Sequence, residues 1–139
     1  MLRLMKLRWA NLFSSSYSLF LKSKNFQYSA ALFWLCLITV LLVIPGSKFP
    51  KENWLDKIWF DKWVHIGLFA ILVFLWCRTV SRIKAFYFIA AAAVFYGIGM
   101  EFVQKHFVSN RGFETLDIVA DALGSISGLL YSLMQYRKK

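Results

Sequence analysis

Acidic residues are scarce in this chain of 139 residues, which has seven Asp and Glu against 17 Lys and Arg and a net charge of +10. Charged residues make up 17% of the chain and hydrophobic residues 59%, whereas soluble domains hold about 25% charged residues. A soluble globular domain is therefore not expected, and the high hydrophobicity excludes a disordered chain. With two prolines and seven glycines, the chain is neither collagen-like nor a linker.

Cysteine is also scarce. Cys36 and Cys77 both lie in apolar runs, so they predict buried thiols rather than a disulfide framework or a metal motif. The first long apolar run begins near Ser29, which is too deep for a cleaved signal peptide, and the Pro45-Gly46 pair after it is typical of a helix exit. We therefore expect a membrane helix that is retained.

Four stretches lack any charged residue, namely 25–47, 63–77, 85–100 and 122–136. A helix needs roughly 20 residues to cross about 30 Å of hydrocarbon, and the first stretch alone meets that length. The others reach only about 22–24 Å at 1.5 Å per residue, so either the bilayer is thin or each helix continues past its bounding charges.

The predicted fold is all-α, a polytopic four-helix transmembrane bundle. Its membrane domain, 27–136, has helices at about 27–45, 61–79, 84–106 and 116–136. A basic segment, 1–26, precedes it and lies in the cytoplasm or, as an amphipathic helix, at the membrane interface. A basic cytoplasmic tail, 137–139, follows it.

Loop charges predict the orientation of these helices. The N-terminal segment, the 78–84 connection and the tail carry basic residues without acids, whereas the other two loops mix both signs. The positive-inside rule then places both termini in the cytoplasm, and Trp54, Trp59 and Trp63 are spaced like an interfacial aromatic belt. Because topology explains the positive charge, we expect membrane lipids as partners and no nucleic acid.

Polar residues at the expected outer ends of the last three helices form the candidate site. Spacings of three or four place Asp61 with His65, and Asp117 with Asp121, on shared helix faces. Ionisable residues inside membrane helices cost free energy and are candidates for function. We predict an outward-facing ligand-binding pocket formed by Asp61, Lys62, His65, Glu101, Gln104, Arg111, Asp117 and Asp121.

Simpler interpretations of these residues stay open. Glu101 can pair with Lys105 on a helix surface, and Asp117 can complement a helix dipole with Thr115 as the cap. The charges at the start of the second helix can be solvated helix ends. Asp121 is the hardest to explain in this way, because it lies inside its helix.

Small residues recur every four positions in the last helix, at Ala120, Gly124 and Gly128. Such residues let helix backbones approach closely. We predict that this face packs against a neighbouring helix, with the alanines of 90–93 and Gly97 as the matching face on the third helix.

Three blocks in this order resemble the VanZ-like family of small membrane proteins. The segment 61–69 is similar to its D-K-x-x-H-x-x-x-F helix start, and 96–104 is similar to its Y-G-x-x-x-E-x-x-Q. Arg111 followed by Asp117, Gly124 and Gly128 is similar to its third block, except that the family has Asn where this chain has Asp121. The resemblance implies a bacterial cytoplasmic membrane and a cell-envelope role.

Three hypotheses of function follow. The favoured one is a pocket that binds an amphiphilic envelope ligand (a lipid head group, a wall precursor or a lipoglycopeptide), holds its anionic group with Lys62 and Arg111, and affects glycopeptide susceptibility. The second is an enzyme on a lipid-linked phosphate or glycan, with His65, Glu101 and Asp117 as acid–base groups or, together with Asp61 and Asp121, as ligands of a divalent metal. The third is a structural bundle. We favour binding over catalysis and expect no cofactor and no metal.

Overall fold

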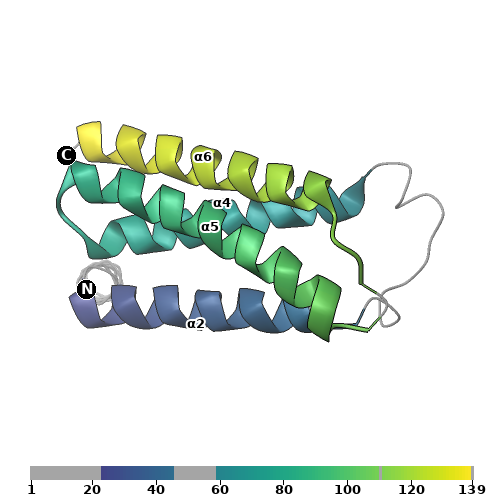
Figure 1. Ribbon diagram of the computed structural model, residues 1–139. Coiled ribbons are helices and arrows are strands. Elements are labelled where there is room, and N and C mark those ends of the chain that lie inside the picture. The colour runs from purple at the N-terminus through teal and green to yellow at the C-terminus, as the bar shows by residue number, and fades with distance from the viewer. Residues whose placement is uncertain (1–22, 46–58, 110, 139) are drawn as a thin grey trace, which may run out of the picture.

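The computed structural model describes residues 23–45, 59–109 and 111–138, and all regular structure within these ranges is helical. The helices are α2 (Lys24–Val43), α4 (Phe60–Thr79), α5 (Ile83–Phe107) and α6 (Thr115–Arg137) (Figure 1). The all-α prediction is thus confirmed, and each of the four helices is long and apolar enough to cross a membrane. Residues 1–22 of the predicted basic segment 1–26 lie outside the described residues. The same holds for 46–58, which includes Trp54.

The helices continue past the charges that bound the uncharged stretches. Asp61 and Lys62 lie in the first turn of α4, and α5 runs beyond Glu101 to Phe107. The four helices have 20 to 25 residues, which corresponds to about 30 Å or more at 1.5 Å per residue. A thin bilayer is therefore not needed to accommodate them. Their ends lie within three residues of the predicted ones.

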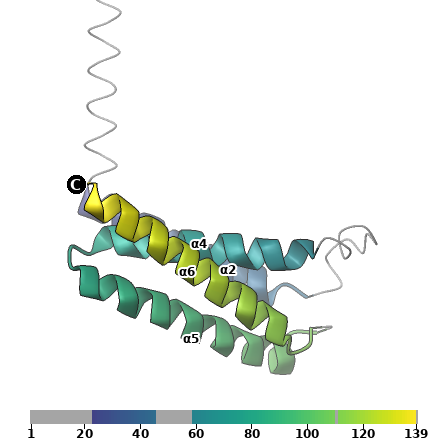
Figure 2. The same ribbon diagram turned by 90° about the horizontal axis from the view of Figure 1, so that it is seen from above.

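α4, α5 and α6 pack on one another, while α2 packs against α4 and α5 on the side away from α6 (Figures 1 and 2). The connection 80–82 has three residues, and such a short link makes α4 and α5 antiparallel neighbours. The start of α4, the end of α5 and the start of α6 consequently meet at one end of the bundle. The start of α2 and the end of α6 lie at the other end (Figure 1).

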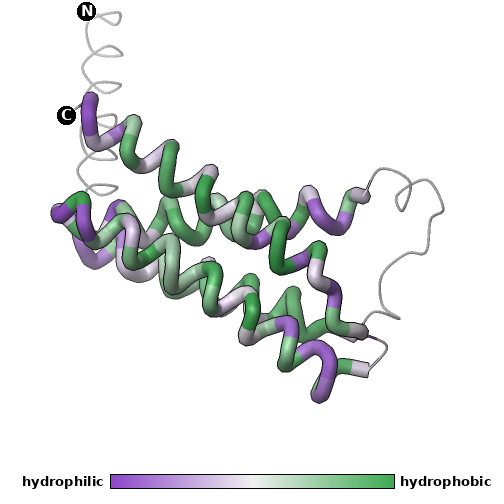
Figure 3. Tube along the Cα trace, turned by 45° about the horizontal axis from the view of Figure 1, so that its top comes forward, coloured by the Kyte–Doolittle hydropathy of each residue, from purple (hydrophilic) through white to green (hydrophobic). Residues whose placement is uncertain are grey.

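Most of the bundle's core and most of the outer surface of its helices are apolar. Its core contains Phe69, Val73 and Met100, and its outer surface exposes other large apolar side chains, with Phe88 77% and Phe95 73% exposed. Figure 3 shows hydrophobic residues along the length of the helices and hydrophilic ones gathered toward the two ends. Helices that are apolar all round belong in an apolar environment rather than in water.

The small residues of α6 pack against α4. A Cβ atom on Gly124 would overlap the carbonyl oxygen of Ile66, and one on Gly128 would overlap the carbonyl oxygen of Ala70. The two backbones can approach this closely only because neither glycine has a side chain. The partner of these glycines is therefore α4, and the prediction that α5 supplies it is wrong. Within the alanine run of α5, the residues at 90 and 93 are buried and those at 91 and 92 are exposed.

Polar bonds attach α2 to its neighbours at intervals along its length. The Trp34 Nε1 donates to the carbonyl oxygen of Leu68 at 3.0 Å, in α4. The hydroxyl groups of Thr39 and Tyr96 lie 2.9 Å apart and link α2 to α5. These bonds place α2 beside the helices that carry the polar residues of the candidate site.

Candidate functional site

The candidate site is a polar cluster at the end of the bundle where α4 and α6 begin and α5 ends. Its deepest side chains are almost completely buried, with 1 or 2% exposed surface: His65, Glu101, Gln104, Asp117 and Asp121. The helix periodicity explains this depth, because residues four apart such as Asp117 and Asp121 point to one side of α6. The antiparallel packing then turns that side toward α4 and α5.

Lys62 connects the cluster to the surface. Its ammonium nitrogen pairs with Asp117, which is buried, and lies 2.6 Å from Glu114 Oε2 and 3.0 Å from Asp61 Oδ2. The side chains of Asp61 and Glu114 are 55% and 57% exposed and form the rim. The Lys62 charge is thus surrounded by three carboxylates and is not presented to an anionic ligand.

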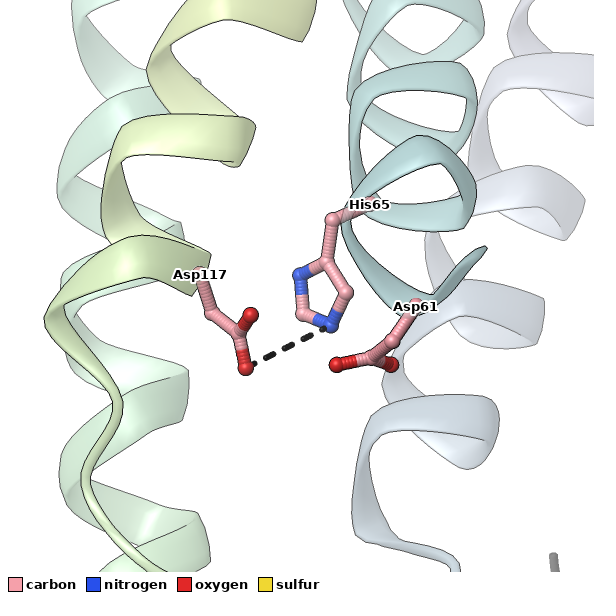
Figure 4. A group of neighbouring side chains, drawn as sticks. All are labelled: Asp61, His65 and Asp117. Carbon is pink, nitrogen blue, oxygen red and sulfur yellow. Dashed lines mark ion pairs between the residues drawn. The ribbon is translucent and has the colours of Figure 1, made fainter. Parts of the chain in front are cut away.

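His65 lies beneath this rim, between α4 and α6. Its Nδ1 is 2.8 Å from Asp121 Oδ1, a hydrogen bond, and its Nε2 is 3.9 Å from Asp117 Oδ2. Figure 4 shows the Nε2 edge of the ring directed between the carboxylates of Asp117 and Asp61. One carboxylate therefore orients the ring, while the other nitrogen points toward the rim.

Gly97 makes room for Asp121. A Cβ atom built on Gly97 would lie 2.5 Å from Asp121 Oδ2, which is too close for any real contact. The sequence-based interpretation placed Gly97 on a helix-packing face but did not predict that Asp121 lies against it. Its missing side chain lets a buried carboxylate sit against α5.

The two buried polar residues of α5, Glu101 and Gln104, form different hydrogen bonds. The Glu101 carboxylate accepts a hydrogen bond from the backbone N–H of Glu114 at 2.9 Å, which ties the start of α6 to α5. The Gln104 amide donates to the carbonyl oxygen of Leu42 at 2.9 Å, at the end of α2. The surface pair of Glu101 with Lys105 does not occur, because Glu101 is buried and the Lys105 ammonium lies over the Phe113 ring.

Two further predictions concern the segment between α5 and α6. Arg111 lies in this connection and is half-buried. Glu114 rather than Thr115 stands at the N-cap position of α6, where its side chain makes no capping hydrogen bond, and Thr115 is the first residue of the helix. Sequence reasoning missed Glu114 as a site residue, and its only signal was its position three residues before Asp117.

Carboxylates predominate in the cluster. Five of them, from Asp61, Glu101, Glu114, Asp117 and Asp121, lie around one lysine ammonium and the His65 ring. Isolated buried charges are costly, so such groups persist when they are paired or protonated or when they hold a ligand. Around Lys62 and His65 the carboxylates outnumber the basic groups that they contact, which favours a cationic ligand group here over the anionic one expected from the sequence.

The fold and the site together define a small helical bundle whose helices are long and apolar enough to cross a membrane, with a buried polar cluster at one end. No family model matches the chain, and no solved structure matches it. It is similar to an uncharacterized protein of the fission yeast Schizosaccharomyces pombe, with 38% identity over 82 residues, which are 57% of this chain and 50% of the relative. The chain thus spans about half the length of this curated relative. The resemblance to the VanZ-like family stays a prediction.

The expected bacterial inner-membrane location is wrong, because the relative comes from a eukaryote. Apolar runs and basic loops are selected by the same physics in membranes of many kinds, so they do not indicate the type of organism. The bacterial assignment came from the family resemblance alone. What the helices support is a membrane protein.

Proposed function

We propose that this chain is an integral membrane protein whose four helices span the bilayer. The support comes from helix length and from exposed aromatic side chains such as Phe33, Phe88 and Phe95 on the outer surface. In water this surface would cost about 25 cal/mol per Å². The chain is expected to stay in the membrane pellet after alkaline carbonate extraction. Release into the supernatant would contradict the proposal.

Within this membrane protein, we propose that the polar cluster binds the head group of a membrane amphiphile. The observation that carries the proposal is the burial of His65, Asp117 and Asp121 between α4 and α6, directly below a solvent-exposed rim. Ionisable groups at such depth in a membrane protein commonly serve binding or transport.

The charge of the cluster favours the ammonium group of a zwitterionic lipid. Lys62 is already paired with three carboxylates, and Asp61 and Glu114 remain partly exposed at the rim. An incoming ammonium can make charge-assisted hydrogen bonds with these oxygens. Neither the structure nor the comparisons support the expected wall precursor, the lipoglycopeptide or the effect on glycopeptide susceptibility.

The test is lipid retention by the full chain in detergent. Equal amounts of phosphatidylethanolamine, phosphatidylcholine and phosphatidylglycerol are added, and retained lipid is measured by native mass spectrometry. Phosphatidylethanolamine is expected to be retained by the wild type and lost in Asp117→Asn. The matched control is His106→Ala, on the exposed end of α5, which leaves retention unchanged.

The lipid outcomes separate the hypotheses. Preferential retention of phosphatidylglycerol that Asp117→Asn abolishes would overturn the proposed sign of the ligand charge. Equal retention by the wild type and a folded Asp117→Asn protein would contradict head-group binding and favour the structural bundle. Only the difference between variants is informative, because basic residues at the opposite end of the bundle, such as Arg82 and Lys84, attract anionic lipids on their own.

A second candidate is an enzyme that acts on a lipid-linked phosphate. One observation favours it: the His65 Nε2 faces Asp117 at 3.9 Å beneath an exposed rim, as an acid–base group would. Phosphate release from a lipid-linked phosphate that is lost in His65→Gln would support it. Head-group retention without any phosphate release would support the binding function and contradict the enzyme.

A further inference from the structure

Three metal-binding side chains approach one another at the rim of the polar cluster. Asp61 and His65 of α4 and Asp117 of α6 each offer a ligand atom, and these atoms lie within 4.8 Å of one another (Figure 4). We propose that these three residues bind a divalent metal ion of the zinc class. This inference departs from the expectation of no metal and follows the metal-ligand alternative that the sequence left open. It goes beyond the proposed function, because the ion would compete with a lipid ammonium for the same carboxylates.

The orientation of His65 is the first argument. Its Nδ1 is hydrogen-bonded to Asp121 Oδ1 at 2.8 Å. When the neutral ring donates this bond from Nδ1 to the carboxylate, the lone pair lies on Nε2. Histidines that bind metals are held in this way, with the distal nitrogen bonded to a carboxylate. Asp121 is then a positioning residue, which sets the tautomer and the direction of the ring.

The environment of Nε2 is the second argument. His65 is 2% exposed, and its Nε2 lies 3.9 Å from Asp117 Oδ2, which is beyond hydrogen-bond distance. Its contact with the Asp117 carboxylate is therefore at the distance of a loose ion pair. Here the nitrogen is directed into the space between two carboxylates, of which Asp61 is open to the outside. An ion can therefore reach the site from the rim.

The ligand atoms of these three residues would have to move only a little to coordinate one ion. Zinc bonds of about 2.0–2.2 Å place the ligand atoms of a tetrahedral site about 3.3 Å apart. The His65–Asp117 separation of 3.9 Å is close to this value. Asp61 has to move farther, and its exposure leaves its side chain free to rotate. Three protein ligands would leave a fourth position open, as in zinc sites that also hold water or substrate.

Lys62 competes with the ion for the same oxygens. Its ammonium pairs with Asp117 and with Asp61, while Glu114 Oε2, at 2.6 Å, offers it an alternative partner on the rim. Metal binding therefore moves the lysine toward Glu114. If these residues form only a structural salt-bridge network, the opposite result is expected. Removal of Lys62 would then disturb the cluster and weaken metal binding instead of strengthening it.

The experiment measures metal binding by the full chain in detergent. The protein is stripped with a chelator, dialysed and titrated with Co²⁺, whose absorption reports the ligands, and then with Zn²⁺ in competition. His65→Ala is expected to lose affinity by more than the roughly 10- to 100-fold loss typical of second-shell changes, and Asp121→Ala to fall in that range. Lys62→Met is expected to bind several-fold more tightly than the wild type.

His106→Ala is the matched control, because it removes the other histidine of the chain from an exposed position. Its affinity should equal that of the wild type. Cys77 is buried, whereas Cys36 is exposed, contrary to the expectation that both thiols are buried. Protection of Cys77 from a maleimide in a Cys36→Ser background therefore reports folding in every variant. Equal affinities for wild type and a folded His65→Ala, or weaker binding by a folded Lys62→Met, would overturn the metal site.

The failure of this inference differs from the failure of the proposed function. Metal binding is measured without added lipid, and lipid retention is measured in the presence of chelator. A chain that retains phosphatidylethanolamine but binds no zinc would overturn the metal site and leave head-group binding intact. A chain that binds zinc but retains no lipid would have the metal site without the proposed function.

Discussion

The two halves of α6 contact α4 in physically different ways. In the middle of α6, Gly124 lies against the backbone of Ile66 with no room for a Cβ atom. In its first two turns, Asp121 meets His65 through a buried hydrogen bond of 2.8 Å. One helix pair is thus held together by shape at one level and by polar bonding a single turn away.

This difference indicates that packing at the glycines sets the distance between α4 and α6, and that the polar contacts of the first two turns depend on that distance. Close backbone approach is a steric requirement, and it brings the helices near enough for short polar side chains to reach each other. Polar bonding tolerates a change of side chain as long as a donor still finds an acceptor. Substitutions in the two halves should therefore differ in size and in the remedy that restores stability.

The largest effect is expected from Gly124→Leu. The new side chain would meet the Ile66 carbonyl, which is backbone and cannot rotate away, so the cost should exceed the roughly 1–3 kcal/mol typical of overpacking. Size-exclusion chromatography in detergent should show loss of the folded monodisperse protein. Gly99→Leu is the matched control on α5, where a Cβ meets nothing within 4 Å. Equal behaviour of the two variants would refute the steric role of Gly124.

The second test concerns the polar half, through Asp121→Ala and Asp121→Asn. Alanine leaves the buried Nδ1 of His65 without its acceptor, which should lower the free energy of unfolding by about 1–3 kcal/mol. Asparagine keeps an oxygen at this position and should lose less than about 1 kcal/mol. Denaturant titration in detergent measures both values. An asparagine variant as unstable as the alanine variant would show that the carboxylate charge, rather than the hydrogen bond, stabilises this half.

A third variant asks whether contacts outside the α4–α6 pair matter as much. Gln104→Leu removes the donor that holds the Leu42 carbonyl at the end of α2, so a loss of about 1 kcal/mol is expected. The same titration applies, with Gln135→Leu on the exposed surface of α6 as the control. A loss larger than that of Asp121→Ala would place α2, rather than α6, at the centre of the bundle's stability.

The smallest effect is expected from Glu114→Gln at the rim. The Glu114 side chain is 57% exposed, and exposed ion pairs contribute about 0.2–1 kcal/mol. The backbone N–H that binds Glu101 is unaffected. Titrations at low and high salt should show a small difference from wild type that shrinks as salt increases. A salt-independent loss would mean that the rim is less exposed to solvent than its surface area indicates.

The sequence predicted many residues of the candidate site but not which residues contact one another. Helix spacing placed His65 and Asp121 among the polar residues of one end, and the structure brings both of them together. The partner of Gln104 was not predictable, because a backbone carbonyl such as that of Leu42 has no signature in the residue type. The role of Gly97 was missed for a related reason, since a missing side chain does not reveal which neighbour fills the space.

The charge of the ligand group that the site favours was also not predictable from the sequence. Lys62 was expected to hold an anionic ligand, because a lysine at a helix start is a cation whatever surrounds it. The three carboxylates that pair with it come from two helix starts, 52 and 55 positions apart in the case of Glu114 and Asp117. Only their meeting in space shows that the lysine is already neutralised.

The sequence by itself determined the all-helical class, the approximate helix limits and the end of the bundle at which the polar residues gather, because hydrophobic runs and helix spacing are local properties of the chain. The tertiary structure alone decided that the glycines of α6 face α4, that Lys62 is enclosed by acids, and that His65 points between Asp61 and Asp117. These features depend on how whole helices rotate and approach one another. Packing of the entire bundle sets that geometry, and no single stretch of residues encodes it.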